Sequence, residues 1–164
     1  MNLAPELTPV LQSLLTGRST AALATLHDGR PFASMIPFAM TMAGGRPRLV
    51  THVSGLSAHT RDMRASPDVC LLVTAGESAG TMPQAVPRVS IAAVAEFIPD
   101  DHPDHAAVKA AYLGKFPEAT DLFQLGDFSL VAFQPTSARL VAGFARAVTL
   151  SPDALAAAAG SSQT

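Results

Sequence analysis

Residues 19–42 have the sequence STAALATLHDGRPFASMIPFAMTM, which predicts a β-hairpin. The segments from Ser19 to Leu26 and from Pro31 to Met42 are largely apolar and have the length of strands. Between them, His27–Arg30 contains an Asp-Gly pair, the dipeptide that favours the tight turn of a hairpin. We therefore expect an antiparallel strand pair near the start of the chain.

Further strands and a few helices are expected along the rest of the chain. Apolar runs bounded by turn residues predict strands at Arg48–Val53, Val69–Ala75, Arg88–Ile98, Asp127–Phe133 and Thr136–Leu150, the last two joined at Gln134-Pro135. Helical spacing of apolar residues predicts helices from Leu7 to Gly17, in the second half of residues 54–64, between Asp104 and Phe116, and at Asp153–Ala159. At least six strands in hairpin order indicate a mostly β fold with helical additions, closed or nearly closed into a barrel.

The composition indicates a second buried surface. Of the 164 residues, 48% are hydrophobic and 15% are charged, an apolar excess that a dimer interface would hide. The net charge of −2 gives no basis for nucleic-acid binding, which requires a concentrated basic patch. We expect one domain over residues 1–151, followed by a short helix and a frayed tail over residues 152–164.

Neither a signal peptide nor a bilayer-spanning stretch is visible, so a cytoplasmic protein with no membrane partner is expected. Cys70 is the only cysteine, and its apolar neighbours favour a small buried hydrophobic residue. His102 and His105 lie close to Asp101 and Asp104, which raises the possibility of a metal site. Their position at a helix N-terminus favours a solvated surface instead, and no metal site is predicted.

Residues 49–73, LVTHVSGLSAHTRDMRASPDVCLLV, carry the chemically most informative pattern. No Gly-rich phosphate loop, nucleophile elbow or cysteine pair occurs elsewhere. Hydroxyls, an imidazole and a guanidinium precede or open a short helix here, and a helix N-terminus adds backbone N–H groups that suit a phosphate. An ordinary helix with Ser57 as N-cap and Arg61 facing solvent explains the same pattern, and spacing alone favours it.

This segment, with PRVSIAAVAEF at residues 87–97 and GDFSLVAFQPTSARLVAGFARAVTL at residues 126–150, resembles the pyridoxamine 5′-phosphate oxidase-like superfamily. Its likeness is nearest to the branch of the haem-utilisation flavoproteins and runs from Leu7 to Leu150. The resemblance implies a split β-barrel of about six or seven antiparallel strands with flanking helices. It also implies a homodimeric FMN-binding oxidoreductase with the flavin between the subunits and a small-molecule substrate that is unknown.

The resemblance also assigns binding residues. In such families the Ser-x-His-Thr-Arg segment binds the phosphate and ribityl chain of FMN, which implies Ser57, His59, Thr60 and Arg61. The strand Ser34, Met35, Ile36 and Pro37 would line the isoalloxazine ring, with Thr51 and His52 beside it. Arg88, across the dimer, and Arg146 would approach the flavin, although Arg88 capping a strand edge and Arg146 pointing outward are alternatives. No side chain is identified as a catalytic acid or base.

Departures from the family pattern keep other functions open. His59 replaces a lysine-like residue and Ala58 stands where an arginine is expected, which argues against pyridoxamine phosphate as substrate. Haem-degrading members place an iron-ligating histidine in a C-terminal extension, but no histidine follows His105. Haem binding or breakdown on the same fold remains an alternative if His52 or another residue takes the ligand role. A non-catalytic flavin-binding protein is a further alternative, as is a deazaflavin-binding protein, which would need more basic charge.

Overall fold

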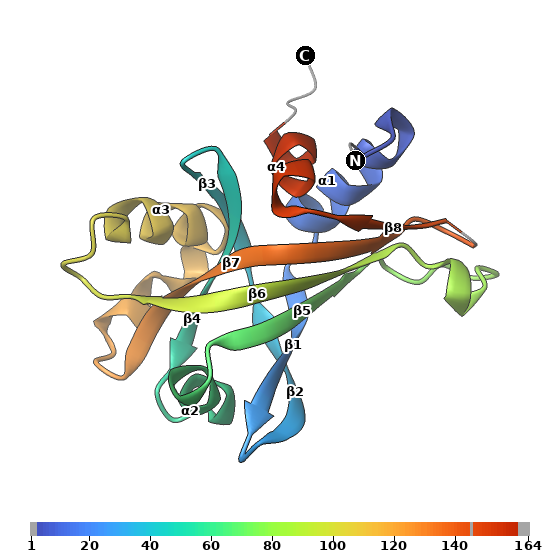
Figure 1. Ribbon diagram of the computed structural model, residues 1–164. Coiled ribbons are helices and arrows are strands. Elements are labelled where there is room, and N and C mark those ends of the chain that lie inside the picture. The colour runs from blue at the N-terminus through green and yellow to red at the C-terminus, as the bar shows by residue number, and fades with distance from the viewer. Residues whose placement is uncertain (1–2, 145, 161–164) are drawn as a thin grey trace.

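The computed structural model describes residues 3–144 and 146–160. In this part of the chain eight strands form one antiparallel sheet in the order β2-β1-β5-β6-β7-β4-β3, and β8 pairs with β7 (Figure 1). The strands are β1 Thr20–His27, β2 Arg30–Pro37, β3 Ala39–Ala43, β4 Arg46–Ser54, β5 Asp68–Thr74, β6 Arg88–Ile98, β7 Phe128–Val141 and β8 Ala147–Leu150. The helices are α1 Thr8–Gly17, α2 Ala58–Ala65, α3 His105–Lys115 and α4 Pro152–Gly160, with 3₁₀ segments η1 Pro5–Leu7, η2 Pro83–Ala85 and η3 Pro117–Gln124.

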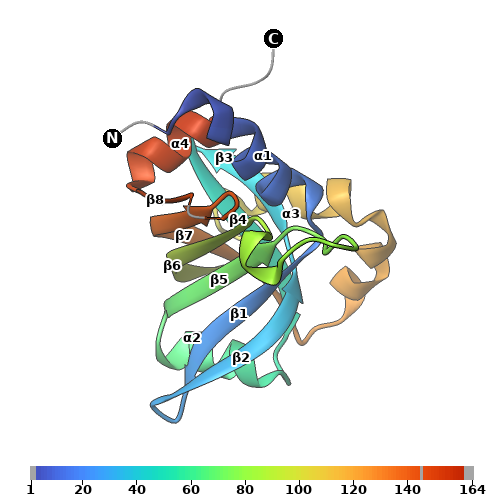
Figure 2. The same cartoon turned by 90° about the vertical axis from the view of Figure 1, so that its right-hand side faces the viewer.

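A bend at Phe38 turns the sheet into a split barrel. β2 and β3 are separated only by this residue, yet β2 pairs with β1 and β3 pairs with β4, at opposite ends of the strand order (Figure 2). Phe38 is fully buried, and its N–H donates to the carbonyl of Ser19 at 3.0 Å. The sequence predicted one strand from Pro31 to Met42. That prediction was wrong at Phe38, because each half of the segment pairs with a different neighbour.

The long strand β7 also corrects an expectation. It continues through Gln134 and Pro135, where the sequence predicted a joint. Pro135 has no N–H to donate, but β4 pairs with β7 only up to Phe133, and β8 begins to pair only at Ala138. On the other side of the strand, the register with β6 shifts between Ala92 and Ala93, so a bulge accommodates the proline.

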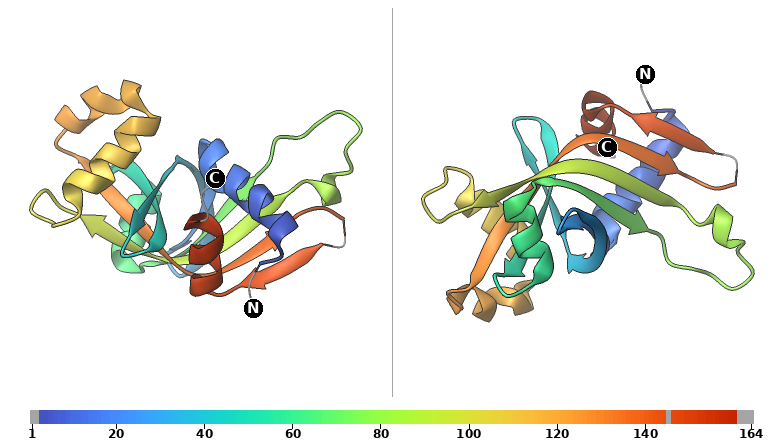
Figure 3. Two further views of the ribbon diagram at one scale, coloured as in Figure 1. Left: turned by 90° about the horizontal axis from the view of Figure 1, so that it is seen from above. Right: turned by 60° about the horizontal axis from the view of Figure 1, so that its bottom comes forward.

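The core consists of two clusters of buried side chains. The larger fills the barrel and continues into α1 and α4, through Leu11, Leu14 and Leu155. The smaller lies where α3 packs on β3, β4 and β7, away from α1 and α4 (Figure 3). The expected C-terminal helix is therefore part of the main core, while the expected frayed tail at residues 161–164 lies outside the described residues. No helix in the described ranges is long and apolar enough to cross a membrane.

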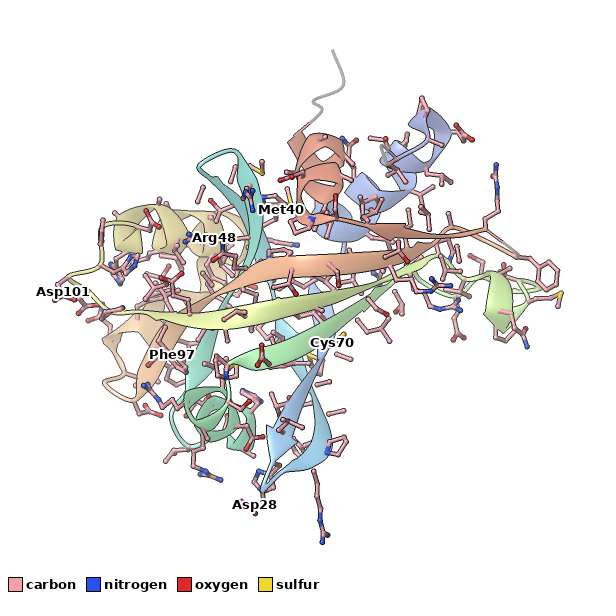
Figure 4. The ribbon with its side chains drawn as sticks, viewed as in Figure 1. Asp28, Met40, Arg48, Cys70, Phe97 and Asp101 are labelled. Atoms are coloured by element: carbon pink, nitrogen blue, oxygen red, sulfur yellow. The ribbon has the colours of Figure 1, made fainter. Side chains whose placement is uncertain are left out.

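Within residues 3–144 and 146–160, no helix covers the outer face of the sheet at β5 and β6 (Figure 1). Along β1, β5 and β6 the inward side chains are buried and the alternate ones point outward, as the strand period requires. Leu72 and Val94 are exposed on the outer side, and Ala22 pairs with Leu72. Cys70, expected in the core, is only half-buried on β5 (Figure 4), and burial raises the pKa of its thiol. An apolar sheet surface is thus left open.

Candidate functional site

The N-terminus of α2 meets β2 through a side-chain hydrogen bond. The hydroxyl of Ser34 and Nδ1 of His59 lie 3.1 Å apart and join two segments 25 residues apart in sequence. Ser57 occupies the N-cap position, where its carbonyl accepts hydrogen bonds from the N–H groups of Thr60 and Arg61 at 3.2 and 3.4 Å. Its hydroxyl makes no capping bond, so it differs from an ordinary N-cap serine and stays available to a ligand.

A tight turn between β4 and α2 sets this geometry. The N–H of Gly55 donates to the carbonyl of Asp127 at 2.6 Å, and the Ser54 hydroxyl donates to the Asp127 carboxylate at 2.7 Å. A Cβ on Gly55 would lie 3.0 Å from the Asp127 carbonyl oxygen, so glycine is needed for the close approach. Thr60 is buried, and its hydroxyl donates to the Ser54 carbonyl at 2.7 Å. Thr60 therefore holds the turn together.

His59 and Arg61 differ in exposure and charge. Burial lowers the pKa of His59, and the nearby Asp62 carboxylate opposes this shift only in part, so the imidazole is neutral near pH 7. Arg61 is exposed, and its Nη1 donates to the carbonyl of Leu56 at 3.1 Å. The guanidinium is thereby held beside the first turn of α2, where its remaining N–H groups can receive an anion.

Asp62 is a buried carboxylate that the sequence did not single out. It accepts hydrogen bonds from the Thr25 hydroxyl at 2.8 Å and from His27 Nδ1 at 2.7 Å, which fixes α2 against β1. Burial alone would raise the pKa of Asp62, but the bonds from His27 and Thr25 outweigh it and lower that pKa. The same bond to Asp62 raises the pKa of His27. The Asp62 carboxylate is thus held by two hydrogen bonds from β1.

The other expected flavin-ring residues are spread over both faces of the barrel wall. Met35 is 64% exposed, whereas Ile36 belongs to the core. The Pro37 carbonyl accepts a hydrogen bond from the buried Thr51 hydroxyl at 2.7 Å, which ties β2 to β4. Of residues 34–37, the structure brings Ser34 into contact with α2.

His52 follows Thr51 on β4 and therefore points to the opposite face. Its ring stacks on Phe123 with centroids 3.8 Å apart and an interplanar angle of 4°, and Phe128 lies 5.0 Å away. Burial, followed by the charge of Lys109, lowers its pKa to about 4. The structure thus separates His52 from the Ser34–His59 pair. This follows from strand geometry, because consecutive residues such as Thr51 and His52 point to opposite faces.

Arg88 and Arg146 lie apart from α2 within the chain. Arg88 donates to the carbonyls of Val86 and Gln84 at 3.0 and 3.3 Å, and it pairs with Thr74 at the end of β5 distant from α2. Six residues of β5 separate that pairing from Asp68, or ~20 Å at the rise of a strand. Arg146 is exposed, with Nη2 3.9 Å from a carboxylate oxygen of Glu6.

The histidines considered for a metal are paired with different carboxylates. His102 Nε2 lies 3.4 Å from Glu96 Oε1, and His105 Nε2 lies 3.1 Å from Asp100 Oδ1. Within residues 3–144 and 146–160, no three His, Cys, Asp or Glu side chains are grouped so that they could hold a metal ion.

Comparisons with known proteins agree with the fold. The chain is 34% identical over 149 residues to the chloroplastic heme oxygenase HOZ of Arabidopsis thaliana, a match that covers 88% of this chain and 43% of HOZ. A heme binding protein from Mycobacterium smegmatis superposes with a TM-score of 0.80 at 29% identity, covering 94% of this chain and 62% of that one. The heme storage protein HutZ of Vibrio cholerae has a TM-score of 0.67 at 31% identity, with 82% and 91% covered.

The chain thus spans less than half of the plant protein and less than two thirds of the mycobacterial one. The resemblance to the branch of haem-utilisation proteins is confirmed. The family model described as pyridoxamine 5′-phosphate oxidase matches residues 7–142, which include all of β1–β7. The chain therefore belongs to the pyridoxamine 5′-phosphate oxidase family.

Proposed function

We propose that this protein binds FMN where the N-terminus of α2 meets β2, and that it acts as a flavoprotein oxidoreductase. The observation that carries the proposal is the hydrogen bond between Ser34 and His59, because it gathers polar groups from two distant segments at one helix end. The proposal concerns the cofactor and the class of reaction and assigns no substrate.

The polar groups at this end of α2 fit a phosphate. Ser57 offers a hydroxyl that does not cap the helix, His59 a neutral imidazole and Arg61 an exposed guanidinium. The partial positive charge of a helix N-terminus adds to them. The carboxylate of Asp62 does not oppose an anion strongly, because His27 and Thr25 bind it on the β1 side.

The bound flavin would supply the redox chemistry, accepting a hydride or electrons from a substrate. The chain would supply binding and orientation: Ser57, His59 and Arg61 would hold the phosphate, and β2 beside Ser34 would face the ring. Ile36 and His52 fall outside this proposal because they lie in the core and on the opposite face.

We further propose a homodimer in which the uncovered sheet face is the contact. Leu72, Val94 and Met35 expose apolar surface that a second copy would cover. Arg88 and Arg146 lie far from the α2 site of their own chain, so their contribution to a flavin would come from the partner subunit.

Haem is the second candidate ligand. Three relatives, HOZ, the mycobacterial protein and HutZ, carry haem or heme oxygenase in their names. The two carboxylates of a haem would suit the same cationic helix end. His52, considered as an alternative iron ligand, is buried among aromatic rings, and no histidine follows His105.

An absorption spectrum and a titration test both candidates. We expect the purified protein to be yellow, or to become so with added FMN. We expect Arg61→Gln to weaken FMN binding roughly 10–100-fold, because a charge-assisted hydrogen bond contributes about 1.5–3 kcal/mol. Arg46→Gln removes an exposed arginine that pairs with Asp153 and serves as control. A colourless protein that takes up no FMN refutes the main proposal, and a Soret band with added haem then supports the second.

A further inference from the structure

A second cleft lies at the C-terminal end of α2, whereas the proposed flavin site is at its N-terminal end. It encloses about 510 Å³ between the C-terminal end of α2, the end of β6, η3 and the start of β7. Three aromatic rings, those of Phe97, Phe123 and Phe128, contribute to its lining. Figure 4 shows Phe97 on the part of β6 that lies above α2. Aromatic walls of this kind suit a flat ring system.

Arg64 supplies a positioned cation at the edge of this cleft. Its guanidinium carbon lies 4.0 Å from the centre of the Phe97 ring, and its Nη2 donates to the Ser129 hydroxyl at 3.3 Å. Two contacts thus orient the group, and the planar guanidinium keeps further N–H groups for a carboxylate.

His52 lines the same cleft and carries a buried polar atom, Nδ1. The side chain is 7% exposed and lines the cleft, and its Nδ1 has no hydrogen-bond partner among the described residues. Burial lowers the pKa of His52 to about 4, so the ring is neutral near pH 7. In a neutral ring Nδ1 donates or accepts one hydrogen bond, depending on the tautomer. A buried polar atom without a partner is unfavourable, and a ligand hydroxyl would relieve that cost.

The charges around the cleft favour an anion. Asp100 faces it but is bound by His105 at 3.1 Å. Nζ of Lys109 lies 4.8 Å from the centre of the ring of Phe123, which lines the cleft, so a second positive charge lies near it. The Asp100 side chain is fully exposed, so solvent screens its negative charge.

We propose that this cleft is a second binding site, for a small aromatic carboxylate with a ring hydroxyl. The carboxylate would bind Arg64, the ring would lie among the phenylalanines, and the hydroxyl would bond to His52 Nδ1. The site is independent of the flavin proposal, since Thr51 and His52 point to opposite faces of β4.

The test uses the full-length protein and 2-hydroxybenzoate as probe. We expect saturable binding, followed by ligand-observed NMR, with a shift of the ¹⁵Nδ1 resonance of His52. Arg64→Gln should weaken binding roughly 10–100-fold, as loss of a charge-assisted pair requires. His52→Phe keeps the ring stack and should weaken binding by a smaller factor. Arg46→Gln, whose arginine lies outside the cleft, should leave it unchanged.

Four results would overturn the proposal: no saturable binding, equal affinity in Arg64→Gln, no response of the His52 resonance, or equal binding of the neutral analogue 2-hydroxybenzyl alcohol. Competition between 2-hydroxybenzoate and FMN would also contradict it, because it would assign the probe to the helix end at Ser57. If FMN does not bind, binding of 2-hydroxybenzoate to the cleft is still expected. The two proposals can therefore be refuted independently.

Discussion

Replacing Phe38 by alanine tests the idea that the bend between β2 and β3 closes the barrel. The side chain is 0% exposed, and Nζ of Lys115 lies 4.6 Å from the ring centre. Removing a fully buried phenylalanine costs about 3–5 kcal/mol. We expect the upper part of this range, because Lys115 also loses the ring face it covers. Single domains are stable by about 5–15 kcal/mol, so Phe38→Ala removes a large share of that margin.

Urea unfolding followed by circular dichroism measures the effect. With a slope of about 2 kcal/mol per molar urea, the midpoint should fall by about 1.5–2.5 M. Phe32→Ala is the matched control, since Phe32 lies on the same strand but is 38% exposed. We expect it to cost about 1 kcal/mol or less. Equal midpoints for the two variants would refute the assignment of Phe38 as the closing residue of the barrel.

Three further predictions concern buried polar groups. Thr51→Val leaves the Pro37 carbonyl without its 2.7 Å partner, and the free energy of unfolding should fall by about 1–3 kcal/mol in urea titrations; an unchanged midpoint contradicts this. Because the bond to Asp62 raises the pKa of His27, its stabilisation is complete below the unfolded value of about 6.5 and is lost as pH rises through the folded pKa. The melting temperature of the wild type should therefore decline relative to His27→Gln above about pH 6.5, and parallel curves would disprove the linkage. The His52 ring should stay neutral down to about pH 4 in ¹⁵N NMR titrations, where a midpoint near 6.5 would show it to be solvated.

Most strands were predictable because their patterns are local. β6 has the bounds Arg88–Ile98 that its apolar run predicted, and the Asp-Gly turn joins β1 and β2 as expected. The breaks were not predictable. The chain bends at Phe38 because the segment before it pairs with β1 and the segment after it pairs with β4, and these two strands are not neighbours in the sheet. Pro135 stays within β7 because β7 bulges at Thr136 in its pairing with β6 and because the pairing with β4 ends at Phe133; both features depend on partner strands that are distant in sequence.

The candidate site also combines residues that the sequence identifies with residues that only the fold brings together. Ser57, His59 and Arg61 could be proposed from the sequence because they follow one another in a recognisable order. The hydrogen bond between Ser34 and His59 brings β2 and α2 together, so the fold places two of the segments named from the sequence side by side. Asp62 was missed, since its partners come from β1 and only the fold brings them together. The side of His52 could have been predicted from the two-residue period of β4.

The central position of β7 has a consequence for synthesis of the protein on the ribosome. This strand joins β6, β4 and β8, so the edge of β4 that is not paired with β3 lacks its partner until residues up to Phe133 have been made. At 5–20 residues per second, roughly 4–16 s pass between completion of β4 and synthesis of Phe133. During that interval one edge of β4 is open to pairing with other chains. We therefore expect nascent chains of this protein to depend on chaperones more than a helical protein of similar length would.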